Sequence, residues 1–206
     1  MAHQFDIVRV SASVLFSFTV LREWGTGDYL EDFLVISAPG EVHVHTSQER
    51  YFPLTEIVQC LRLAAQGRRV LVVQLLKGGI DGGPARPRKL MGEHLIWLRP
   101  DVARVIDSPP TEAEREAVAC LWCHVEESVA HFDLLVLDEV GLAVRFRLLS
   151  EATLLALLKT RPATLEIMLT GPEVSEAVRP LADIWSVRCG HLDQSTSARH
   201  FMAAGA

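Results

Sequence analysis

The sequence predicts an α/β domain whose mostly parallel sheet lies between two layers of helices. After Gly40, short apolar runs alternate with segments of helical periodicity, and strands that alternate with helices form parallel sheets. One apolar run, from Phe132, ends in the acidic pair Asp138-Glu139. This form is typical of a buried parallel strand that brings carboxylates to a nucleotide's metal ion and phosphates. With 206 residues, 49% of them hydrophobic, the chain can bury the core of one such domain.

The first 40 residues predict a β-hairpin-like extension ahead of this domain. Every second position from Val8 to Val20 is apolar, which is the period of a half-buried strand. A turn-rich segment and a second β-prone run follow it. The apolar run 5–21 contains Asp6 and Arg9 and is short for a bilayer span of ~20 residues. We therefore expect no membrane segment.

The elements expected in the domain can be assigned in chain order. Pro53 suits the first turn of a helix. Thr111 and Glu114 form a capping box that begins another helix, and its apolar stripe has helical spacing. The segment 77–93 reads as a loop rich in Gly, Pro and basic residues, and the small, polar residues 191–206 as a loose tail after a domain at 41–190. The expected strands are 41–46, 69–76, 94–98, 133–138, 164–169 and 183–187, and the expected helices are 53–66, the helix after Thr111, 150–159 and 173–180.

Charge and cysteine content exclude several classes of protein. The net charge is −6 and the isoelectric point about 5.7, whereas nucleic-acid and anionic-membrane binders need a basic face. The four cysteines come without a signal-peptide pattern and are expected to be reduced thiols of a cytoplasmic protein.

Several segments resemble, in order, the ATP:corrinoid adenosyltransferases of cobalamin synthesis. They are the strand from Arg69 to Lys77 with two glycines after it, the strand ending in Asp138-Glu139, and the segment ending in Thr170-Gly171. The resemblance covers about residues 41–187. It implies a three-layer fold like that of the P-loop NTPases.

The segment that should bind phosphate departs from the family. In the family, the first strand runs into a loop of the form T-G-N-G-K-G-K-T-T, whose backbone N–H groups and Lys hold the ATP phosphates. Here residues 46–54 read T-S-Q-E-R-Y-F-P-L. No glycine remains, Phe52 takes the Lys position, and Pro53 takes the position of the Mg²⁺-binding Thr. A second departure is Pro172 after Thr170-Gly171, where the family usually has Arg.

The resemblance still implies a few residual site residues. Asp138 and Glu139 are the candidates for catalysis and for Mg²⁺. Arg50, Lys77 and Thr170 are the candidates for nucleotide contacts. MgATP and a corrinoid are expected as ligands only if the family activity is retained.

Two other patterns suggest metal or haem chemistry but have simpler explanations. His43 and His45 lie two residues apart on one face of a strand, and ordinary strand side chains explain them. Cys120-Leu-Trp-Cys123-His124 matches a haem-attachment pattern. It falls in the middle of a predicted helix whose stripe includes Trp122, so we interpret it as coincidence.

These observations favour a degenerate relative of the family with a non-catalytic binding or regulatory role. The alternatives are an active ATP:cob(I)alamin adenosyltransferase and an inactive subunit that pairs with an active paralogue. We expect a protein partner or a homo-oligomer, with residues 5–21 as the candidate contact, because an exposed strand edge invites strand addition.

Overall fold

The computed structural model describes residues 39–78 and 82–188. Apart from Pro39, these residues belong to one compact unit that begins at Gly40. The predicted extension at 1–40 lies, except for its last two residues, outside the described residues, as does the predicted tail at 191–206. Among the described residues, no helix is long and apolar enough to cross a membrane.

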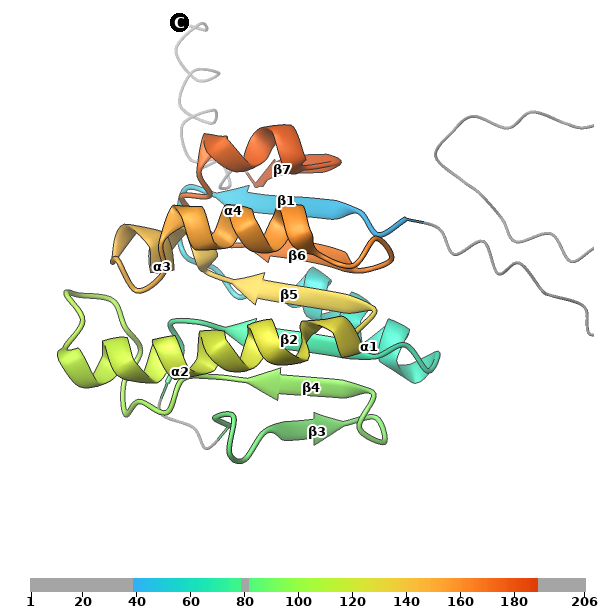
Figure 1. Ribbon diagram of the computed structural model, residues 1–206, viewed down its shortest axis with the longest axis horizontal. Helices are drawn as coiled ribbons and strands as arrows, with labels where there is room; N and C mark the ends of the chain where they lie inside the picture. Colours follow the sequence, from blue (N-terminus) through green and yellow to red (C-terminus); the bar gives the residue numbers. More distant parts are fainter. Residues whose placement is uncertain (1–38, 79–81, 189–206) are drawn as a thin grey trace, which may run out of the picture. The chain divides into compact units, whose positions relative to one another are not determined.

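The described part of the chain forms a seven-stranded sheet of order β3-β4-β2-β5-β6-β1-β7 (Figure 1). Six strands run parallel, and β3 pairs antiparallel with β4 at one edge. One strand, β6, separates β1 from β5. The strands are β1 (Val42–Ser47), β2 (Val70–Gln74), β3 (Arg88–Leu90), β4 (Leu95–Leu98), β5 (Leu134–Asp138), β6 (Glu166–Thr170) and β7 (Ile184–Arg188).

Helices cover both faces of the sheet, as predicted. In Figure 1, α2 and α4 lie on the near face and α1 lies behind the sheet. Thr111 caps α2 through the predicted capping box, in which it accepts from the backbone N of Glu114 while the Glu114 side chain accepts from the backbone N of Thr111. The helices are α1 (Leu54–Ala65), α2 (Glu112–Ser128), α3 (Val140–Arg145) and α4 (Glu151–Thr160), with short 3₁₀ segments η1 (Val129–His131) and η2 (Glu176–Leu181).

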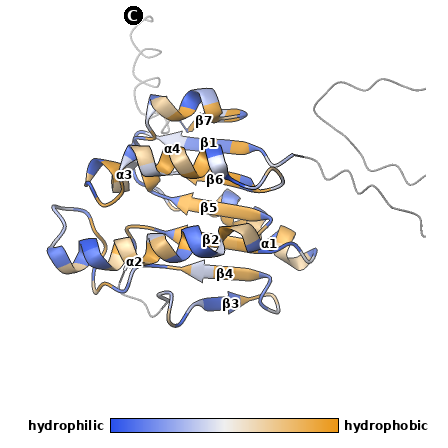
Figure 2. Cartoon of the chain, viewed as in Figure 1, coloured by the Kyte–Doolittle hydropathy of each residue, from blue (hydrophilic) through white to orange (hydrophobic). Residues whose placement is uncertain are grey.

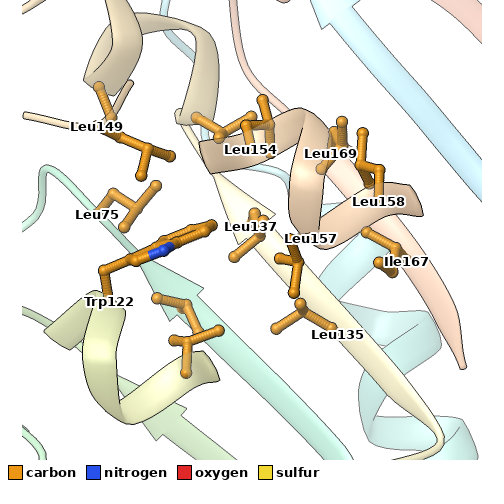
Figure 3. Packing of buried hydrophobic residues seen from close by; sticks show 14 of the residues in the cluster. Leu75, Trp122, Leu135, Leu137, Leu149, Leu154, Leu157, Leu158, Ile167 and Leu169 are labelled. Carbon is orange, nitrogen blue, oxygen red and sulfur yellow. The ribbon is translucent and has the colours of Figure 1, made fainter. Parts of the chain in front are cut away.

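The alternation of side chains along each strand builds two apolar layers. Leu71 and Val73 of β2 pack with the α2 and α4 side, whereas Val70 and Val72 pack with α1. On the α2 side, the indole of Trp122 lies among leucines of the strands and of α4 (Figure 3). In Figure 2, β5 is hydrophobic along its length and the edge strand β3 is hydrophilic, so burial on both faces is confined to the centre of the sheet.

The observed elements agree with the predicted ones except at four places. β3 and α3 were not predicted, and the predicted helix at 173–180 is the 3₁₀ segment η2, which contains Pro180. β3 is exposed along its length, so it has no apolar pattern and forms only because it pairs with β4. Pro53 precedes α1 as its N-cap residue and does not lie within its first turn.

Candidate functional site

The carboxyl ends of the parallel strands meet at one edge of the sheet, where α/β proteins bind ligands. Asp138 is the last residue of β5 and lies in register with Gln74 of β2 and Thr170 of β6. Thr170 is in register with His45 of β1. The four side chains therefore form a row on the α1 face of the sheet, beside the turn that leads from β1 into α1.

Both oxygens of the Asp138 carboxylate accept hydrogen bonds from neighbouring side chains. Its Oδ2 accepts from Lys77 Nζ and Gln74 Nε2, each at 2.8 Å, and its Oδ1 accepts from Thr170 Oγ1 at 2.8 Å. The side chain is 1% exposed. Lys77 thus neutralises Asp138 within the chain, and the two uncharged donors fix the orientation of the carboxylate.

The carboxylate of Glu139 is held separately by Arg50. The Nε and Nη2 atoms of Arg50 donate to Oε1 and Oε2 of Glu139 at 2.6 and 2.7 Å. Arg50 Nη1 also donates to the carbonyl of Ile106 at 3.2 Å. The Glu139 side chain is 1% exposed, against 31% for Arg50. The hydrogen bond to Glu139 is the main reason why the pKa of Arg50 is raised.

The backbone turns sharply between the two acidic residues. Glu139 has φ of 61°, in the left-handed region that a residue with a side chain seldom adopts, and its N donates to the carbonyl of Thr170 at 2.9 Å. Gly171 has φ of 98°, and a Cβ there would lie 2.9 Å from Cα of Glu139. On either side of this turn the two carboxylates have different partners: Asp138 bonds to Gln74 of β2 and Thr170 of β6, and Glu139 bonds to Arg50.

That turn, at the position of the expected phosphate loop, packs its own side chains against the strand ends. The Tyr51 hydroxyl donates to the carbonyl of His45 at 3.2 Å. The Phe52 ring lies 5.6 Å from Lys77 Nζ. Pro53, which has no N–H, offers no side-chain cap to α1. Arg50 and Tyr51 thus bond to the strand ends, whereas the Phe52 side chain is 51% exposed.

A further carboxylate, that of Glu56, lies in the first turn of α1. Glu56 is 6% exposed, and its Oε2 has no hydrogen-bond partner in the part of the chain that the structure describes. Burial, and next the charge of Glu56, raise the pKa of Tyr51 to about 12. Burial also lowers the pKa of His45, which the charge of Glu56 opposes. The positive end of this helix therefore already faces a negative group of the chain itself.

The structure brings the five predicted site residues together at this edge: Arg50, Lys77, Asp138, Glu139 and Thr170. It pairs them with one another, an arrangement that the sequence did not indicate. The residues missed are Gln74 and Glu56. Their signal was a polar side chain in an apolar context, since Gln74 ends a fully buried strand and Glu56 lies on the buried face of α1.

The two metal-like patterns do not form metal centres among the described residues, where no group of three or more His, Cys, Asp or Glu side chains is arranged to hold an ion. The rings of His43 and His45 lie on one face of β1, 6.2 Å apart. His45 Nδ1 bonds to Ser186 Oγ at 2.7 Å. Cys120 and Cys123 lie near the middle of α2, and both are exposed to solvent.

A mostly parallel sheet between two layers of helices, with an acidic pair at the end of β5, is the architecture of the P-loop NTPase-like class of α/β domains. A comparison with protein families matches residues 40–194 to the family described as ATP:corrinoid adenosyltransferase BtuR/CobO/CobP. The chain belongs to this family, and the resemblance seen in the sequence is confirmed. A comparison with curated proteins gives no match.

Proposed function

We propose that this protein is a non-catalytic member of the corrinoid adenosyltransferase family, with a binding or regulatory role. The observation that carries the proposal is the bidentate pair of Arg50 and Glu139, at 2.6 and 2.7 Å. Arg50 comes from the turn that stands in place of the phosphate loop. The chain thereby supplies its own cation to the carboxylate that would otherwise act on a nucleotide's metal ion.

The residues present do not fit MgATP. Mg²⁺ relies on phosphate oxygens together with one or two carboxylates. Both candidate carboxylates here are buried and paired, Glu139 with Arg50 and Asp138 with Lys77. The first turn of α1 would have to receive the phosphates, and it carries the buried carboxylate of Glu56. Pro53 removes one backbone donor, and residues 46–54 include no glycine that would let the backbone approach a phosphate.

The decisive experiment is calorimetric titration of the purified protein with MgATP. We expect no saturable binding. The matched variant replaces residues 46–54 with the family loop T-G-N-G-K-G-K-T-T, and we expect it to gain MgATP binding because Lys and the backbone donors return. Saturable, tight binding by the unaltered protein would overturn the proposal.

An activity assay distinguishes the proposal from an active adenosyltransferase. In that reaction a Co(I) nucleophile attacks the 5′ carbon of ATP and triphosphate leaves, so the cradle for the triphosphate supplies much of the stabilisation of the leaving group. We expect no adenosylcobalamin from reduced cobalamin and MgATP. Product formation above the level of a Glu139→Gln control would show that the family activity is retained.

A binding role requires a partner, and α1 offers an apolar surface for one. Phe52, Leu54 and Val58 are each more than half exposed, at 51, 62 and 54%, although large apolar side chains usually avoid water. The partner is a protein: another copy, an active paralogue or an unrelated chain. Co-purification from the native cell, with and without residues 1–40, would separate contacts made by this surface from those made by residues 5–21.

A further inference from the structure

At the β4 end of the same edge, one guanidinium group is held in place by uncharged side chains of the described residues. The Nε atom of Arg99, which follows β4, donates to Gln74 Oε1 at 2.8 Å. Trp97 Nε1 donates to the same oxygen at 3.0 Å. Gln74 Nε2 in turn donates to Asp138, and Gln74 is 0% exposed. Because three hydrogen bonds fix this buried amide, it holds Arg99 in a defined position.

The charge of Arg99 differs in its surroundings from those of Arg50 and Lys77 at the same edge. Arg50 is paired with Glu139 and Lys77 with Asp138, so each of these charges is neutralised. Within the described residues, no carboxylate lies within 4.0 Å of a nitrogen of Arg99, and neither of its Nη atoms donates a hydrogen bond. Among the described residues, Arg99 is therefore a positive charge at the carboxyl end of β4 that no carboxylate pairs at close range, although the charge of Asp138 acts on it from a longer distance.

The surroundings of Arg99 favour an anionic ligand. Burial, followed by the charge of Arg88, lowers the pKa of Arg99. The charge of Asp138 opposes both influences, and an anion placed against the guanidinium would oppose them further. The guanidinium carbon also lies 5.9 Å from the centre of the Trp97 ring, and this contact further fixes its plane.

We propose that Arg99 is an oxyanion-binding site that takes a carboxylate or phosphate group end-on through its two Nη atoms. Gln74 already occupies Nε, which leaves the pair of terminal nitrogens for a bidentate contact of the kind that guanidinium groups make with planar oxyanions. Gln74 and Trp97 act as positioning residues. The site is separate from the Arg50–Glu139 pair, so this inference stands whether or not the protein binds MgATP.

The test titrates the full chain, without Mg²⁺ or nucleotide, with inorganic pyrophosphate in one arm and citrate in the other. Binding is measured by calorimetry and by tryptophan fluorescence, since Trp97 shares the Gln74 oxygen with Arg99. We expect saturable binding of at least one probe, and the arm that binds more tightly identifies phosphate or carboxylate as the preferred group. A Trp97→Phe variant should lose the fluorescence change and still bind by calorimetry.

Two substitutions at Arg99 decide the assignment. Arg99→Met should weaken binding by about 10- to 100-fold, the usual value of a charge-assisted contact. Arg99→Lys keeps the charge without the fork and should fall between Arg99→Met and the unaltered protein. Arg115→Met, on the exposed surface of α2, is the matched control and should bind as the unaltered protein does. The unfolding midpoint of each variant confirms that it is folded.

Two results would overturn the inference. One is the absence of binding of both probes to the unaltered protein. The other is equal affinity of the unaltered protein and the two Arg99 variants, which would place the anion elsewhere. If Arg99→Met alone failed to fold, the affinities of Arg99→Lys and the unaltered protein could still be compared, because Arg99→Lys retains the charge.

Discussion

Removing Arg50 is the sharpest test of how the strand end is held. In an Arg50→Ala variant, Glu139 would keep a carboxylate that is 1% exposed and would lose both of its guanidinium bonds, at 2.6 and 2.7 Å. Breaking a buried ion pair from one side costs about 3–5 kcal/mol, because the remaining charge is left without a partner. An exposed pair contributes only about 0–1 kcal/mol.

The expected cost lies near the lower end of the buried range. Arg50 is 31% exposed, so water can reach the space that the guanidinium leaves. We therefore expect a loss of about 3 kcal/mol in the free energy of unfolding. For a domain of this size, that loss lowers the thermal midpoint by roughly 6–12 °C. Urea unfolding and a thermal melt, both followed by circular dichroism, measure the two quantities.

Two further variants show whether the cause is the uncompensated charge. Arg115→Ala removes an exposed arginine whose partner Glu112 lies at 3.9 Å, and it should change stability by no more than about 0.5 kcal/mol. Adding Glu139→Gln to Arg50→Ala removes the orphaned charge and should recover part of the loss. Equal effects of Arg50→Ala and Arg115→Ala, or no recovery in the double variant, would refute the reasoning.

Three other predictions follow from burial and capping. Burial lowers the pKa of His45 from 6.5, so the unfolded state binds more protons as the pH falls below that value. Stability should then fall from about pH 7 to pH 5 less steeply in His45→Gln than in the unaltered protein, and equal slopes would contradict this. Burial raises the pKa of the Cys60 thiol to about 12. Iodoacetamide should therefore label exposed Cys120 and Cys123 in the native state and Cys60 only after unfolding, as peptide mass mapping would show. Thr111→Ala should cost about 1 kcal/mol through loss of the helix cap, and Thr111→Ser should restore most of it in the same urea assay.

Local patterns were sufficient to predict most of the fold. Apolar runs located the six parallel strands to within a few residues, and Thr111 with Glu114 located the start of α2. β3 was missed because its exposed residues depend on β4 for pairing. α3 was missed because it is only six residues long and has no capping residue that the sequence would reveal. It begins directly after Glu139, which is in the left-handed conformation.

The sequence was sufficient to predict most residues of the candidate site, but not which of them pair with one another. Asp138 and Glu139 are adjacent in the sequence and look equivalent, yet the turn at Glu139 sends them to different cations. Arg50 and Glu139 are 89 positions apart, and neither residue carries a local signal for the other. Pairings of this kind depend on strand order and backbone direction, which only the folded sheet determines.

The pairing of Arg50 with Glu139 also bears on how easily the family loop could be placed in this domain. Once the loop supplies a cation to the acidic residue, stability comes to depend on that cation. Exchanging residues 46–54 for the family loop places a Lys at position 50 and removes the bidentate pair with Glu139, before any nucleotide can bind and compensate for the loss. The contact thus couples the stability of this strand end to the sequence of the loop. The grafted-loop protein should accordingly be less stable than its parent until it is given MgATP.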